Sequence, residues 1–306
     1  MKNLRKYLVV LLKGVGMGSA DVIPGVSGGT IAFITGIYEE LVNSIKSIDL
    51  EALKLFFTGR WKSFWQHING TFLLSLFAGI FTAVVSLAKI LEHLLESQPV
   101  LIWSFFFGLI LISSFVVAKK IKVWEYPVIV ALVSGIGAAF YITSVTPAHT
   151  TDEAWFIVLA GILASCAMIL PGISGSFILL LLGKYQFALA AVNEVDIKAI
   201  LLLGSGAVIG LLSLSRLLSW LFKKYHDITV AMLAGFMLGS LNKIWPWKET
   251  IETVIVDGIE KPVVQKNILP AIGNADDQLI WAILMMLVGI GVILLFELVL
   301  TKKDKS

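Results

Sequence analysis

Two short stretches decide the fold of this chain. Residues 24–30 read Pro-Gly-Val-Ser-Gly-Gly-Thr, and residues 171–177 read Pro-Gly-Ile-Ser-Gly-Ser-Phe. Each lies in the middle of a long apolar region, 5–45 for the first and 155–190 for the second. Proline lacks an N–H and disfavours helix at the preceding residue, whereas glycine permits close backbone approach. Each stretch therefore predicts a helix that breaks and begins again at a serine N-cap.

The composition predicts that these breaks lie inside a membrane. Of the 306 residues, 58% are hydrophobic and only 15% are charged, and the mean hydropathy is +0.90. A soluble domain has about 25% charged residues, so the class that fits is an all-α polytopic membrane protein. The only cysteine, Cys166, excludes a disulfide within the chain. The formal net charge of +3 is too small to indicate a nucleic-acid partner.

Six further apolar stretches are long enough to cross a bilayer as helices. They are residues 71–95, 99–118, 124–145, 198–222, 228–245 and 279–300. The nine tryptophans lie near the ends of these stretches or in loops, as in an aromatic belt. Each broken region enters and leaves on the same side, either as a re-entrant hairpin, which we favour, or as two full spans.

The placement of Lys and Arg predicts the orientation. If the N-terminus is cytoplasmic, the most basic loops all fall on the cytoplasmic side, as the positive-inside rule requires. We therefore expect a multi-pass protein of the plasma (inner) membrane with both termini in the cytoplasm and no cleavable signal peptide. In the long outer segment 246–278, Asp257 and Gly258 between β-rich runs predict a small hairpin, to which we assign no function.

The duplication extends beyond the two breaks. At the same spacing of 147 residues, Gly36 pairs with Gly183, and a later block pairs Gly79 with Gly206 at a spacing of 127. Each half thus holds one broken region and three spans. Because three is odd, we expect the second half to be inverted relative to the first, as in secondary transporters with a site near the midplane. The alternative is a duplication kept only for packing, which broken helices in lipid disfavour.

We accordingly expect residues 1–153 to form the first repeat and residues 154–306 the second, within one membrane domain. Two helix N-termini that enter from opposite faces would present free N–H groups and partial positive charge to a shared polar site. Such ends suit a phosphate group. The residues expected to line this site are Ser27, Gly28, Gly29, Thr30, Ser174, Gly175 and Ser176.

Charged residues within the apolar regions are the other candidates. Lys89 and Arg216 fall at equivalent positions of the two halves, and we expect one cation near each mouth to capture phosphate. Snorkelling to the interface, or pairing of Lys89 with Glu92, is the alternative. Asp21 lies in an apolar stretch and is a candidate for carrying a coupling proton. Glu39 is a second candidate for that role.

These residues resemble a known family. Residues 20–30, Ala-Asp-Val-Ile-Pro-Gly-Val-Ser-Gly-Gly-Thr, together with the second copy, look like bacterial and archaeal membrane proteins long catalogued as a domain of unknown function and now described as polyprenyl-phosphate transporters (PopT). The resemblance covers essentially the whole chain, and the second copy departs from it at Ser176 and Phe177. It implies a flippase that returns undecaprenyl phosphate from the outer to the cytoplasmic leaflet for envelope polymers. It also implies an architecture similar to that of the DedA-type proteins.

The residues alone leave two alternative functions open. One is a secondary transporter for a small soluble anion. The other is a membrane enzyme such as a lipid phosphatase, which needs a nucleophile with a His or Asp partner, or metal-binding carboxylates. Asp21 stands alone and no histidine lies in a mid-membrane motif. We therefore expect no catalytic residue, metal or cofactor. The resemblance implies a polyprenyl phosphate lipid in the membrane as the partner, and a homo-oligomer stays open.

Overall fold

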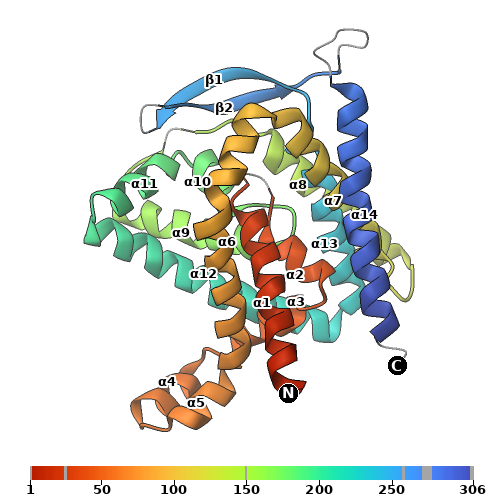
Figure 1. The fold of residues 1–306 in the computed structure, drawn as a ribbon. Coiled ribbons are helices and arrows are strands. Elements are labelled where there is room, and N and C mark those ends of the chain that lie inside the picture. The colour runs from red at the N-terminus through yellow and green to blue at the C-terminus, as the bar shows by residue number, and fades with distance from the viewer. Residues whose placement is uncertain (1, 24–25, 149, 257–258, 271–277, 304–306) are drawn as a thin grey trace.

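The computed structural model describes residues 2–23, 26–148, 150–256, 259–270 and 278–303. The chain forms a bundle of helices topped by one β-hairpin, and α1 begins at the same end of the bundle at which α14 ends (Figure 1). The first half contains α1 (Lys2–Asp21), α2 (Gly28–Ile34), α3 (Tyr38–Lys46), α4 (Leu50–Phe57), α5 (Trp61–His67), α6 (Gly70–Ser97), α7 (Pro99–Ala118) and α8 (Tyr126–Ser144). The second half contains α9 (Ala154–Ile169), α10 (Gly175–Leu181), α11 (Tyr185–Asn193), α12 (Ile197–Lys224), α13 (His226–Ser240), β1 (Lys248–Val256), β2 (Ile259–Asn267) and α14 (Leu279–Lys303).

Several helices are long and apolar enough to cross a membrane, which makes this a multi-pass membrane protein. Within the described residues, α6, α7, α8 and α12 meet this criterion, and α10 with α11 would be a fifth span if the pair is counted together across its 111° bend. All six predicted spans are helical. The prediction for 228–245 was too long, because α13 ends at Ser240 and the chain then turns through the polar residues Asn242 and Lys243.

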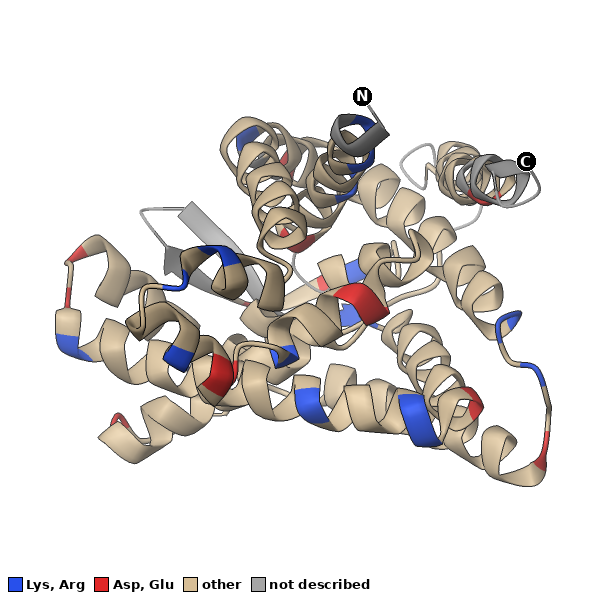
Figure 2. Cartoon of the chain, turned by 90° about the horizontal axis from the view of Figure 1, so that it is seen from below, with Lys and Arg blue, Asp and Glu red and all other residues tan. Residues whose placement is uncertain are grey.

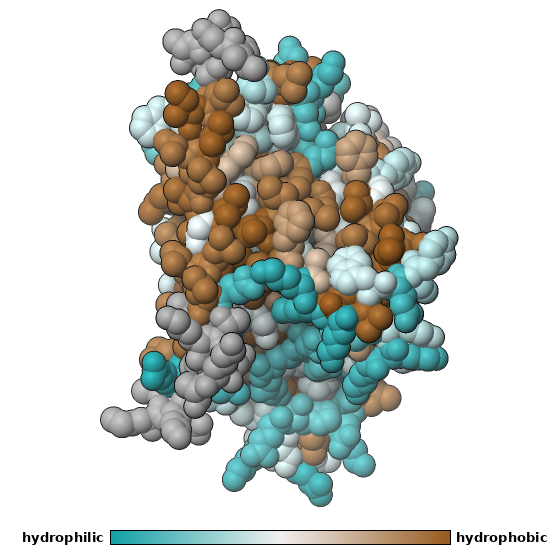
Figure 3. All heavy atoms as spheres, turned by 90° about the vertical axis from the view of Figure 1, so that its right-hand side faces the viewer, coloured by the Kyte–Doolittle hydropathy of each residue, from teal (hydrophilic) through white to brown (hydrophobic). Residues whose placement is uncertain are grey.

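The surface of the bundle fits this class. On the side of the bundle where α14 lies, hydrophobic residues make a broad band, and hydrophilic residues gather below it (Figure 3). Figure 2 looks onto the end of the bundle at which the termini lie, and it shows Lys and Arg on several of the elements that reach this end. An apolar band between polar ends is the surface that a bilayer requires.

Helices α4 and α5 project from the bundle at the same end (Figure 1). Their aromatic side chains pack on one another, with the Phe56 ring centroid 4.7 Å from that of Trp61. Leu50 and Phe57 are nevertheless more than four-fifths exposed. Exposed apolar side chains beside Lys54, Arg60 and Lys62 are typical of helices that lie at a membrane surface.

The predicted hairpin is confirmed at the opposite end. Strands β1 and β2 pair antiparallel from Lys248–Asn267 to Val256–Ile259. The turn at residues 257–258 lies outside the described residues. The Trp245 indole N–H donates to the Ile268 carbonyl at 2.8 Å, which fastens the base of the hairpin to the chain leaving α13.

The two halves contain elements of matching length at the spacings found in the sequence. Helices α2 and α10 have 7 residues each, α3 and α11 have 9 each, and α6 and α12 have 28 each. The turns between the short helices both place a glycine in the left-handed region, Gly36 with φ 73° and Gly183 with φ 64°. The sequence pairs these two glycines because only glycine adopts this conformation freely.

Glycines also set the helix crossings in an equivalent way. Gly79 on α6 lies against the backbone of α1, where a Cβ would overlap the Leu11 carbonyl. Gly206 on α12 lies against α9, where a Cβ would overlap the Val158 carbonyl. Likewise, α7 packs on α14 and α13 packs on α8 through close glycine contacts. Backbone contact of this kind is how helices associate closely in lipid.

We predict that Gly206→Ala destabilises the protein. The added methyl meets backbone that cannot move aside, and overpacking of this kind costs about 1–3 kcal/mol. Thermal unfolding of the purified protein in detergent should therefore shift to lower temperature. Gly204→Ala, on the same helix, is the control, since a Cβ there has nothing within 4 Å and gains helix propensity. Equal unfolding midpoints for the two variants would contradict the prediction.

Candidate functional site

The first break leads into α2 through a serine cap. Ser27 has extended backbone, φ −117° and ψ 131°, and its hydroxyl accepts the Gly29 N–H at 3.1 Å. The Ser27 carbonyl accepts the Thr30 N–H at 3.0 Å. Both residues are buried, with Ser27 1% and Thr30 0% exposed. The predicted N-cap is therefore confirmed, whereas Pro24 and Gly25 lie outside the described residues.

The second break has a similar backbone but a different cap. Gly172 has φ 92°, and a Cβ there would lie 2.9 Å from the Phe236 carbonyl on α13, so only glycine fits. Ser174 precedes α10 with extended backbone, φ −96° and ψ 138°, but makes no side-chain cap bond. Its hydroxyl instead pairs with the Ser176 hydroxyl at 2.7 Å. Among the described residues, no side chain caps the first N–H groups of α10.

The structure brings the two breaks into direct contact. The Ser27 hydroxyl donates to the Leu170 carbonyl at 3.1 Å, and the Gly172 N–H donates to the Thr30 hydroxyl at 3.0 Å. Gly29 faces the Ile169 carbonyl so closely that a Cβ would lie 2.6 Å from it. We call this contact between residues 27–30 and 169–172 the junction. It satisfies backbone groups that two interrupted helices would otherwise leave unpaired inside the bundle.

Asp21 makes the N-terminus of α2 different from the N-terminus of α10. Its carboxylate accepts the Gly28 N–H at 2.6 Å, and so places a negative charge at the N-terminus of α2. At the other end of α2, Lys13 donates to the Thr35 carbonyl at 2.6 Å and Lys120 to the Phe33 carbonyl at 3.3 Å. The residue of the second half that corresponds to Asp21 is Met168. Helix α2 is therefore capped by charged side chains at both ends, while no carboxylate of the described residues caps the start of α10.

Lys89 and Arg216 lie apart from the junction. Both side chains are exposed on long helices, Lys89 on α6 and Arg216 on α12. In the described part of the chain, neither has a hydrogen bond or an ion pair with a residue of the two breaks. One turn beyond Arg216, the Ser219 hydroxyl donates to the side-chain carbonyl of Asn43 at 2.8 Å, which joins α12 to α3.

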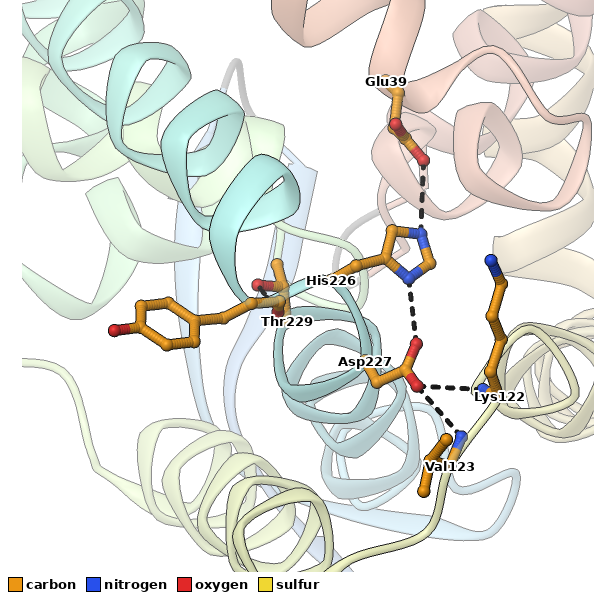
Figure 4. A network of polar contacts seen from close by, with 7 residues as sticks. Glu39, Lys122, Val123, His226, Asp227 and Thr229 are labelled. Carbon is orange, nitrogen blue, oxygen red and sulfur yellow. Dashed lines mark hydrogen bonds and ion pairs between the residues drawn. The ribbon is translucent and has the colours of Figure 1, made fainter.

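Glu39 belongs to a chain of polar contacts at the end of the bundle that holds the termini (Figure 4). One of its carboxylate oxygens lies 3.7 Å from Nε2 of His226, whose Nδ1 lies 3.1 Å from Asp227. The other oxygen of the Asp227 carboxylate accepts the N–H groups of Lys122 and Val123 at 3.1 and 3.0 Å. The sequence did not single out His226 or Asp227, although adjacent titratable residues at the start of a span were a usable signal.

Lys184 is another residue to which the sequence assigned no partner. It is 2% exposed, and its ammonium lies 2.5 Å from an Asp152 carboxylate oxygen and 3.0 Å from the Thr150 carbonyl. The Thr150 hydroxyl in turn donates to the Leu182 carbonyl at the end of α10. The loop before α9 therefore holds the C-terminal end of α10 in place, as Lys13 and Lys120 hold α2.

Fold and site together define a helical, multi-pass membrane protein whose two interrupted helices meet at a buried polar junction. The chain belongs to the undecaprenyl phosphate translocase-like family, whose model matches residues 17–261. It is 45% identical over 296 residues to a polyprenyl-phosphate transporter of Vibrio cholerae, which covers 95% of this chain and 96% of the relative. It is 33% identical over 258 residues to a polyprenyl-phosphate transporter of Staphylococcus aureus, covering 77% of this chain and 85% of that protein. No solved structure matches the chain.

We predict that Thr30→Val destabilises the protein more than Thr30→Ser. Valine keeps the shape of the side chain but leaves the Gly172 N–H without its acceptor, and an unpaired buried donor costs about 1–3 kcal/mol. Serine retains the hydroxyl. The unfolding midpoints of the two purified variants give the comparison. If valine and serine shift the midpoint equally, the bond between the breaks does not stabilise the fold.

Proposed function

We propose that this chain is a flippase that returns polyprenyl phosphate, and specifically undecaprenyl phosphate, from the outer to the cytoplasmic leaflet for envelope polymer synthesis. The observation that carries the proposal is a buried polar junction inside an apolar bundle, in a chain that matches curated polyprenyl-phosphate transporters over nearly its whole length. The phosphate would pass through the polar centre while the prenyl chain stays in lipid. The chain acts without a chemical step, so it is a transporter and not an enzyme.

The architecture that we propose is an inverted repeat of residues 1–153 and 154–306. Equal helix lengths and equivalent glycine contacts in the two halves support it. Helices α2 and α10 support the re-entrant form of the broken regions, because seven residues rise only about 10 Å, a third of the apolar thickness of a bilayer. The basic residues near the ends of α1, α7, α12 and α14 support cytoplasmic termini in the plasma membrane.

The phosphate contacts that we propose lie chiefly at the second break. Ser174, Gly175 and Ser176 begin α10, where the donors are uncapped, and Ser176 is only half-buried. At the first break the N–H groups of Gly28 and Gly29 already have acceptors. Phosphate would reach these groups, and the hydroxyls of Ser27 and Thr30, after the junction opens. The exposed Lys89 and Arg216 would attract the headgroup at the two mouths.

Asp21 supplies a reason for proton coupling. Its carboxylate occupies the N-terminus of α2, which is the place where a phosphate would otherwise bind. Two anions compete for one set of donors, and protonation of Asp21 would remove the competing charge. Glu39 is the second candidate for this role, through its contact with His226.

We predict that Ser174→Ala slows transport. The variant loses the hydroxyl pair beside the proposed phosphate, and a hydrogen bond to a charged group contributes about 1.5–3 kcal/mol, or roughly tenfold or more in rate. In cells that depend on this chain, undecaprenyl phosphate should accumulate at the outer surface, measured with a membrane-impermeant phosphate-binding probe. Ser205→Ala is the control, because that hydroxyl bonds only within α12. No accumulation, with Ser174→Ala folded and abundant, would remove Ser174 from the site.

We predict that Asp21→Asn makes transport independent of pH. Asparagine still offers an oxygen to the Gly28 N–H but carries no charge and no titrating proton. In proteoliposomes, the wild-type rate should rise as pH falls, because protonation of Asp21 removes the charge that competes with phosphate, whereas the variant, which carries no charge there, should be fast throughout. Glu39→Gln is the comparison. If only Glu39→Gln flattens the pH profile, coupling runs through Glu39.

A further inference from the structure

A polar cavity of about 320 Å³ is lined partly by the base of the β-hairpin. The hairpin lies at the end of the bundle opposite the termini (Figure 1). The cavity volume is at the lower end of the roughly 300–1,000 Å³ range of small-molecule sites. The end of α8 with the loop after it, helix α10 and the turn after α13 form its walls, and the bases of β1 and β2 complete it. Most of its lining side chains carry hydroxyl, amide or ammonium groups, notably Thr143, Ser144, Asn242, Lys243, Lys248 and Asn267.

Three lysines, Lys243, Lys248 and Lys266, line this cavity, and the first two lie against aromatic rings. The Lys248 ammonium is buried and has no hydrogen-bond partner among the described residues, and it lies 3.6 Å from the centre of the Trp103 ring. The Lys243 ammonium lies 4.7 Å from the centre of the Phe177 ring. No aspartate or glutamate is among the described residues that line the cavity. Aromatic faces attract the two cations but accept no ordinary hydrogen bond from them.

The pKa values of the two lysines also indicate that the cavity suits an anion. Burial lowers the pKa of Lys243, and burial together with the nearby Lys243 lowers the pKa of Lys248 well below its usual range. Two neighbouring amino groups without a carboxylate are costly to protonate in an empty cavity, because burial removes their hydration and their like charges repel. A bound anion would reverse both effects. A phosphate monoester carries about −1.5 to −2 charges at neutral pH and three acceptor oxygens, which matches two lysines with amide neighbours.

The cavity adjoins the second break. Phe177 and Leu181 of α10 line it, and Phe177 directly follows Ser176, whose hydroxyl pairs with that of Ser174. A phosphate held by the lysines would therefore lie beside the start of α10. The sequence could not show this arrangement, because both lysines lie in a segment with no motif, and only the fold brings Lys243 to Phe177 and Lys248 to Trp103.

We propose that Lys243 and Lys248 form an anion site that captures a phosphate monoester before it reaches the junction. The direction of capture, from the outer side of the membrane, rests on the proposed function, whereas the binding chemistry does not. The ligand is either the headgroup of a prenyl phosphate or free inorganic phosphate, which present the same oxygens to the lysines.

The site can be tested by binding to the purified full-length protein. The probes are farnesyl phosphate, inorganic phosphate and farnesol, and the variants are Lys243→Gln and Lys248→Gln. Each variant should weaken phosphate-dependent binding about tenfold, as expected for the loss of one charge-assisted hydrogen bond. Lys248→Arg should retain binding. Lys198→Gln, an exposed lysine in the first turn of α12, is the control and should bind like the wild type.

The probes distinguish the two ligands. Tighter binding of farnesyl phosphate than of inorganic phosphate identifies a lipid headgroup site, and equal affinities identify a site for free phosphate. Wild-type affinity in both glutamine variants, or equal binding of farnesol, would overturn the proposal. Thermal unfolding controls for misfolding, because phosphate should raise the midpoint of the wild type but not that of Lys248→Gln.

Failure of the proposed function would look different. If the chain transports no polyprenyl phosphate yet binds phosphate through these lysines, the anion site stands and the proposed function falls. If transport proceeds while both glutamine variants bind phosphate like the wild type, the function stands and the site falls.

Discussion

The fold depends on the two hydrogen bonds that join the broken helices, Ser27 to the Leu170 carbonyl and the Gly172 N–H to Thr30. An interrupted helix leaves backbone groups unpaired, and lipid offers no partner for them. Each break supplies what the other lacks, so neither is stable in a bilayer alone. This mutual requirement gives a physical reason for keeping both copies of the motif.

Close helix packing makes these bonds possible. Glycine at the crossing of α1 with α6, and again at the crossing of α9 with α12, lets the backbones touch. The helices that precede the breaks are thereby fixed against the longest helices of the bundle. The hydrophobic effect contributes little between helices in lipid, so this backbone contact and the polar junction hold the structure together.

The repeat made much of this fold predictable. Spacings of 147 and 127 residues, read from glycines and the two Pro-Gly stretches, correspond to pairs of helices of equal length. Periodicity could not reveal that α13 stops at Ser240, because apolar residues continue to Leu241 and Ile244. Nor could it find the partners of Lys184 or Lys248. Lys184 meets Asp152 of a loop, and Lys248 of the hairpin meets Trp103, and both contacts form only in the folded chain.

The two halves differ at a few equivalent side chains, and these differences indicate what each half would contribute to transport. Thr30 joins the breaks, whereas its counterpart Phe177 lines the cavity of Lys243 and Lys248. Asp21 fills one helix end with negative charge, whereas Met168 leaves the other neutral. A phosphate held by the lysines would meet an uncapped helix end first and a carboxylate beyond it. Passage of an anion across such a path requires that Asp21 give up either its charge or its hydrogen bond to Gly28. The similar backbones of the two halves would then provide two mouths, and the side chains that differ between the halves would give the path its direction.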